Sequence, residues 1–103
     1  MRDKNLERIK EVIKSIFPDA QIILFGSRAR GDYKENSDYD IMVIIEQELN
    51  IKDKRQYSSY IRKKLIEKRI LADVLIRTKK DANYYQDKIG SITRIALLKG
   101  VRL

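Results

Sequence analysis

The central part of the sequence, residues 21–45, is QIILFGSRARGDYKENSDYDIMVII. Two apolar runs, Gln21–Phe25 and Tyr39–Ile45, enclose a polar segment that contains two glycines. Short runs rich in β-branched residues and bounded by turn-forming residues are typical of buried strands. We therefore predict two strands joined by a polar loop, which has room for one helical turn after Ser27.

Helical patterns flank these two strands. Apolar residues recur every three or four positions between Asp3, a suitable N-cap, and Pro18, which ends the pattern. A second helix is predicted from the capping pair Asn50 and Asp53 to Arg69, because apolar residues there repeat at every fourth position. Each helix has one apolar face, so we expect both to pack against the sheet.

The last third of the chain contains one further strand and one further helical region. Ile70–Ile76 is an apolar run and a predicted strand, interrupted by one acidic residue, Asp73, which looks buried in this pattern. The segment after Thr78 begins with a capping box and carries an apolar stripe up to Gly100, which fits one kinked helix or two short ones. Val101–Leu103 either adds an edge strand or frays.

The order of these elements predicts an α/β or α+β domain in which helices cover a small sheet, although the order alone does not define the topology. A chain of 103 residues is too short for two cores, so we assign residues 1–103 to a single domain. No apolar run approaches the roughly 20 residues that a membrane span requires, and no signal peptide is recognisable. A cytoplasmic protein without membrane contact is therefore expected.

The amino-acid composition excludes several kinds of chemistry. The chain contains no Cys and no His. Disulfides, thiolate or imidazole metal ligands, cysteine nucleophiles and the Ser-His-Asp triad are therefore ruled out. Any catalysis must use carboxylates, hydroxyls, amines or a bound cation.

The positive charge is concentrated in one predicted helix. The chain has a net charge of +8, and the segment from Lys52 to Arg69 holds eight basic and two acidic residues, a net +6. Charge runs of this kind are usually solvated helix faces, but they also bind anionic partners. Nucleic-acid binding would require aromatic residues between the cations, and only Tyr57 and Tyr60 are available, so an acidic protein partner is favoured over nucleic acid.

Two carboxylates are directed to one point at the start of the second predicted strand. Asp38 and Asp40 are two residues apart, and the period of a strand places both side chains on the same face. Their repulsion is relieved by a shared proton or by a cation, and oxygen ligands favour Mg²⁺ or Mn²⁺. Asp73 would complete the site if the third strand lies beside the second. The alternatives are a solvated turn for the first two and a salt bridge for Asp73.

The end of the first predicted strand is suited to phosphate binding. Gly26 lets backbone N–H groups approach a phosphate, and Ser27 adds a hydroxyl and, if a helical turn starts there, unpaired N–H groups. Arg28 and Arg30 could neutralise the same phosphates, or could equally face water. Three carboxylates with two metal ions fit nucleotidyl transfer with pyrophosphate as the leaving group.

The spacing of these residues resembles a known signature. Gly26-Ser27, nine intervening residues and then Ser37-Asp38-Tyr39-Asp40 look like the motif of the DNA polymerase beta nucleotidyltransferase superfamily, and more narrowly of the minimal nucleotidyltransferases (MNT). The resemblance implies a mixed sheet flanked by helices. It also implies two Mg²⁺ ions, or Mn²⁺, on Asp38, Asp40 and Asp73, with Asp73 on the metal that activates the acceptor hydroxyl. The resemblance implies that Gly26 and Ser27 contact the nucleotide phosphates, and we add Arg28, Arg30 and Ser37 to the predicted nucleotide-binding residues.

Stand-alone members of this size resemble the antitoxin half of HEPN/MNT toxin–antitoxin pairs. The resemblance implies transfer of AMP from ATP to a hydroxyl, a tyrosine, of a partner HEPN toxin, within a hetero-oligomer. Two other functions stay open at this stage. One is an inactive binding module that neutralises its partner by occlusion, and the other is a nucleotidyltransferase acting on a small molecule.

Overall fold

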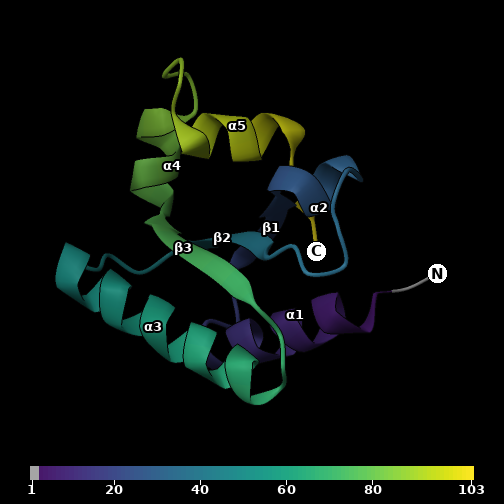
Figure 1. Cartoon of the computed structure of the whole chain (residues 1–103). Coiled ribbons are helices and arrows are strands. Elements are labelled where there is room, and N and C mark those ends of the chain that lie inside the picture. Colours follow the sequence, from purple (N-terminus) through teal and green to yellow (C-terminus); the bar gives the residue numbers. More distant parts are fainter. Residues whose placement is uncertain (1–2) are drawn as a thin grey trace.

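Helices lie on both sides of a four-stranded sheet in the computed structural model, which describes residues 3–103 (Figure 1). The first two residues of the predicted domain are outside the described part. The elements in chain order are α1 (Lys4–Ile16), β1 (Gln21–Phe25), α2 (Gly26–Arg30), β2 (Tyr39–Ile45), α3 (Ile51–Glu67), β3 (Ala72–Thr78), α4 (Lys79–Tyr85), α5 (Ile92–Lys99) and β4 (Val101–Arg102). The predicted small mixed sheet flanked by helices is confirmed.

The strand order is β3-β2-β1-β4. β1 pairs antiparallel with β2 on one side and with β4 on the other, so the last residues form the edge strand that the sequence left open. β2 and β3 are parallel, and α3 is the crossover helix that a parallel pair requires. In the resulting register Asp40 pairs with Phe25 of β1 and with Asp73 of β3.

Each face of the sheet has its own apolar core. α1 and α3 cover one face, where Ile41, Val43 and Ile45 of β2 point, and α4 and α5 cover the other, where Met42 and Ile44 point (Figure 1). This alternation follows from the period of two along a strand. Asp40, two residues before Met42, therefore faces the side that carries α4 and α5.

The predicted helix caps are confirmed. The side chain of Asp3 caps α1, that of Asn50 caps α3, and Thr78 forms a reciprocal capping box with Asp81 at the start of α4. The apolar stripe beyond Thr78 forms two short helices, because Ser91 caps α5 separately. Each cap stabilises its helix by about 1 kcal/mol, since it satisfies a backbone N–H that the first turn leaves unpaired. No helix in residues 3–103 is long and apolar enough to cross a membrane.

The end of α3 corrects the predicted start of the third strand. Arg69 has φ +61°, and the N–H of Ile70 donates to the carbonyl of Leu65 at 2.9 Å, which closes the helix with a Schellman turn. Ile70 is buried beneath this turn and does not belong to the strand. The strand predicted over Ile70–Ile76 is therefore wrong by two residues at each end, because the left-handed turn takes up the first two apolar positions.

Candidate active site

The Asp40 carboxylate lies beside the first residue of α2. Gly26 follows the last residue of β1 and has φ +73°, and a Cβ built on it would overlap with Oδ2 of Asp40. Only glycine combines this backbone conformation with the space that the carboxylate occupies. The sequence analysis assigned Gly26 to phosphate approach, and the structure adds that Gly26 makes room for Asp40.

Two of the predicted aspartates, Asp38 and Asp73, are within electrostatic reach of the third, Asp40. Burial raises the pKa of Asp40, and the negative charges of Asp73 and Asp38 raise it further, while the charge of Arg30 acts in the opposite direction. Asp73 does not fit its sequence assignment as a buried residue, because it is the second residue of β3 and is exposed. The parallel register nevertheless places it directly beside Asp40.

The side chains in this cluster suit a hard divalent cation. Asp38, Asp40 and Asp73 offer only carboxylate oxygens, the ligands that Mg²⁺ and Mn²⁺ prefer, and their mutual repulsion is the kind that a cation relieves. Within residues 3–103, no three Asp, Glu, His or Cys side chains are arranged to hold one ion together. The chemistry of these donors fits a metal ion, while the described side chains do not form a complete set of ligands around one point.

Arg28 holds the loop that precedes β2. Its guanidinium donates to the carbonyl of Ser37 through Nε at 3.1 Å and Nη2 at 2.9 Å, and to the carbonyl of Glu35 at 3.0 Å. The same group lies between two aromatic rings, 4.4 Å from the centroid of Tyr33 and 4.3 Å from that of Tyr39. Arg28 is thus engaged in positioning the loop, a role that the sequence analysis did not predict.

Two further contacts anchor this loop. Tyr39 is buried and its hydroxyl donates to Oδ2 of Asp3 at 2.8 Å, which ties the start of β2 to the cap of α1. Burial raises the pKa of Tyr39; the hydrogen bond from Asn5 opposes this shift and the contact with Asp3 adds to it. The Ser37 hydroxyl accepts the backbone N–H of Lys34 at 2.9 Å. The sequence analysis did not predict either contact.

The remaining predicted nucleotide-binding residues lie around the start of α2. Ser27 is in its first turn, whose N-cap, Phe25, provides no side-chain hydrogen bond. Arg30 is exposed and its Nε lies 3.2 Å from Oδ2 of Asp32. A glycine turn, a serine and three carboxylates are therefore gathered at one end of β1, β2 and β3.

Comparison of the chain with protein-family models identifies the family to which it belongs. The family model for the nucleotidyltransferase domain matches residues 6–99. The chain belongs to this family. The match covers every element that forms the candidate site, so the nucleotidyltransferase domain extends across nearly the whole chain.

Other proteins are similar to this nucleotidyltransferase domain over part or all of its length. A Methanocaldococcus jannaschii protein to which protein adenylyltransferase activity is attributed is 38% identical over 53 residues, which is 50% of this chain. The match spans 54% of that relative, about half its length. Among solved structures, one attributed to a nucleotidyltransferase covers 98% of this chain and 99% of its own, with 26% identity and a TM-score of 0.58.

Two further structures share the fold. A structure attributed to a Sulfolobus solfataricus nucleotidyltransferase has a TM-score of 0.54 and 25% identity, and covers 96% of this chain and 76% of that one. The complex of the tri-AMPylated Shewanella oneidensis HEPN toxin with its MNT antitoxin contains a chain with a TM-score of 0.60 and 18% identity. That match covers 99% of this chain and 71% of the other, and at this identity it supports the fold alone.

Proposed function

We propose that this domain transfers AMP from ATP, with Mg²⁺, to a tyrosine hydroxyl of a partner HEPN-type toxin and thereby acts as its antitoxin. The observation that carries the proposal is the pairing of Asp40 with Asp73 across β2 and β3, with Asp38 within electrostatic reach of Asp40. Two kinds of relative support it. One is attributed protein adenylyltransferase activity, and another is an MNT antitoxin bound to an AMPylated HEPN toxin.

The proposed reaction is an in-line displacement at the α-phosphorus of ATP. The acceptor oxygen forms a bond to this phosphorus, the bond to the bridging oxygen of the β-phosphate breaks, and pyrophosphate leaves. Asp38 and Asp40 would hold Mg²⁺, which neutralises phosphate charge and lowers the barrier to displacement when it is bound. Asp73 is exposed beside Asp40, so its carboxylate is the group available to orient the acceptor hydroxyl and to receive its proton.

The phosphates of ATP would lie against the start of α2. Gly26 and Ser27 supply backbone N–H groups and a hydroxyl there, and Arg30 supplies positive charge. Arg28 and Ser37 were predicted to contact the nucleotide as well. Because both are engaged in the loop before β2, we assign them the role of placing Asp38 next to the phosphates.

The direct test is the intact mass of the partner after co-expression. The partner to use is a gene neighbour of this chain that encodes a small helical protein with an Arg and His ribonuclease motif, where the genome contains one. Mass spectrometry should show the addition of one or more AMP groups with the wild type and none with the double variant Asp38→Asn, Asp40→Asn. The control is Asp19→Asn, Asp87→Asn, which changes charge equally at two exposed positions outside the cluster.

Either of two results would contradict the proposal and favour a different function. An unmodified partner that still co-purifies with the wild-type chain and is still neutralised would indicate occlusion without catalysis. An unmodified partner together with consumption of ATP in the presence of a small hydroxyl compound would indicate transfer to a small molecule.

A further inference from the structure

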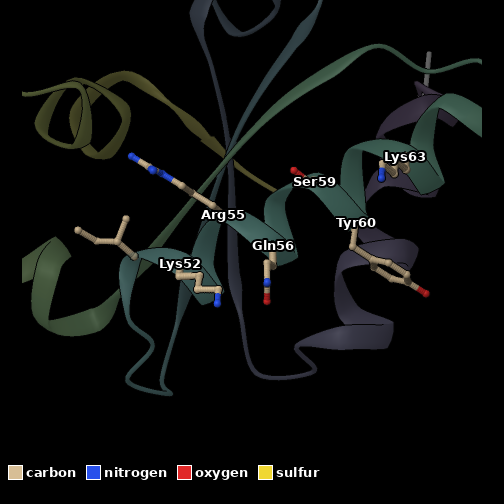
Figure 2. Close-up of a pocket in the computed structure, with 7 residues that line it drawn as sticks. Lys52, Arg55, Gln56, Ser59, Tyr60 and Lys63 are labelled. Atoms are coloured by element: carbon tan, nitrogen blue, oxygen red, sulfur yellow. The ribbon is translucent and has the colours of Figure 1, made fainter.

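Four cations form a stripe along the exposed side of α3. Lys52, Arg55, Arg62 and Lys63 are spaced by three, seven and one residues, which places them on one face of the helix, and all four are exposed. Figure 2 shows Lys52 and Arg55 near the start of this helix and Lys63 further along it. We call these four residues the α3 stripe.

The α3 stripe has no ion pair with any carboxylate in residues 3–103, unlike other cations of the same helix. Lys54 lies 3.0 Å from Oδ2 of Asp81, and Lys64 lies 3.9 Å from Glu67. None of the four stripe residues has a carboxylate partner among residues 3–103. Their charge is therefore available to an anionic partner.

The α3 stripe leads to the candidate active site. An open groove of about 750 Å³ runs along its first part, and a second hollow of about 310 Å³ lies at its far end. Ser59 and Lys63 line both. The second hollow also includes Asp38 of the acidic cluster and Ala72, the residue before Asp73. A chain lying along the stripe would thus reach Asp38, at the edge of the acidic cluster.

Exposed apolar side chains accompany the cations. Ile51, Tyr60, Ile66 and Leu71 line the same two hollows and are 51–64% exposed. Mixed apolar and Arg or Tyr surfaces are typical of protein-binding sites, where the apolar groups supply most of the affinity. Single-stranded nucleic acid would instead require several stacking rings, and among the described residues that line these hollows Tyr60 is the one aromatic.

We infer that the α3 stripe is the docking surface for an acidic, partly apolar segment of the acceptor protein, which brings its hydroxyl to the acidic cluster past Asp38. This inference rests on the proposed function and names the kind of acceptor that the site selects. Charge complementarity of this type mainly increases the rate of association and the preference for one partner, and it weakens as salt is added.

The test compares two charge-reversal variants of the full chain. Arg55→Glu, Lys63→Glu alters the stripe, and Lys10→Glu, Lys80→Glu makes the same charge change at exposed positions on α1 and α4 that have no ion pair among residues 3–103. The probes are a labelled peptide with one tyrosine flanked by glutamates and a leucine, the same peptide with glutamines, and a poly(U) RNA. Fluorescence anisotropy measures binding, and mass spectrometry with ATP and Mg²⁺ measures transfer.

We expect the wild type and the control variant to bind the acidic peptide alike, and the stripe variant to bind it at least about tenfold more weakly. Equal binding by both variants, or tighter binding of the RNA through the same two residues, would overturn the inference. If the stripe-dependent binding is found but no peptide gains AMP, the docking surface stands and the proposed transfer fails. If AMP is added equally to both peptides by both variants, transfer stands and the docking surface is wrong.

Discussion

Two clusters of like charge lie next to each other in this protein and are held in different ways. The acidic cluster is built on the sheet, where the register of β2 and β3 and the space beside Gly26 place the Asp40 carboxylate partly out of solvent. The α3 stripe extends from an exposed helix, where water surrounds each cation. The first arrangement opposes folding, because burial and the two neighbouring carboxylates raise the pKa of Asp40, and the second has little cost.

This difference indicates what each cluster is for. A destabilising arrangement at one end of the sheet is consistent with a site in which the exact position of oxygen atoms matters, since function is the usual reason for such repulsion. The cationic side chains of the α3 stripe are long and exposed. They can attract an anionic partner by charge, but the sheet does not hold them at defined positions. Substitutions in the acidic cluster should therefore abolish chemistry, and those in the stripe should change affinity in a salt-dependent way.

The largest effect is expected for Asp40→Asn. Removal of one carboxylate from the acidic cluster should lower nucleotide transfer by about 100- to 1,000-fold. The melting temperature should stay the same or rise, because the variant removes a charge whose burial and repulsion by Asp73 and Asp38 raise the pKa of Asp40. Mass spectrometry of the acceptor and thermal unfolding measure the two effects. Retained transfer in Asp40→Asn, or an equal loss in the exposed control Asp19→Asn, would contradict the assignment.

Gly26→Ala should damage the same cluster through the backbone. Gly26 and Gly90 both have positive φ, so alanine is strained at either position by about 1–2 kcal/mol. A Cβ at Gly26 would also collide with Asp40, whereas a Cβ at Gly90 meets open space. Denaturant unfolding and transfer assays should show that Gly90→Ala loses stability alone and that Gly26→Ala loses more stability together with activity. Equal behaviour of the two variants would show that Gly26 has no steric role at Asp40.

A smaller effect is expected for Arg28→Lys. Lysine cannot donate to two carbonyls while lying flat between two rings, so the loop before β2 should loosen. Transfer should fall by about tenfold, and the affinity for Mn²⁺, measured by calorimetry without nucleotide, should fall with it because Asp38 is no longer held. Arg8→Lys, at an exposed position on α1, is the control. An unchanged Mn²⁺ affinity in Arg28→Lys would rule out the positioning role.

The pH dependence of stability should distinguish Asp40 from an ordinary surface carboxylate. Its pKa is raised in the folded protein, so the wild type is favoured relative to Asp40→Asn at low pH and loses this advantage as pH rises through the folded pKa. From about pH 4 to about pH 7, Asp40→Asn should gain a few degrees in melting temperature over the wild type. Mg²⁺ should reduce this difference. A difference that is constant with pH would mean that Asp40 is not repelled in the folded state.

The smallest effect compares two lysines of α3. Burial acts to raise the pKa of Asp81, but hydrogen bonds from Lys54 and Thr78 outweigh it and lower the pKa. Lys54→Met should therefore reduce stability at neutral pH by up to about 1 kcal/mol, and this loss should disappear as pH falls through the pKa of Asp81. Lys52→Met, in the unpaired stripe, should leave stability unchanged. Equal melting temperatures for both variants at neutral pH would show that the Lys54–Asp81 pair contributes nothing.

Much of this fold could be predicted because its signals are local. The caps Asp3, Asn50 and Thr78 and the first two strands lie where the sequence places them, since each depends on residues within a few positions. The Schellman turn at Arg69 was missed because it lacks the usual glycine, and the third strand was shifted as a result. A Schellman turn without glycine cannot be recognised from the spacing of apolar residues alone.

The sequence by itself determined the element order, the positive charge of α3 and the presence of Gly26, Asp38 and Asp40 at the spacing of the family motif. Only the tertiary structure decided that Asp73 pairs with Asp40, that Arg28 holds the loop, and that the α3 stripe meets the acidic cluster. The physical reason is that periodicity and capping act over a few residues, whereas strand register and helix placement depend on how distant apolar faces pack together.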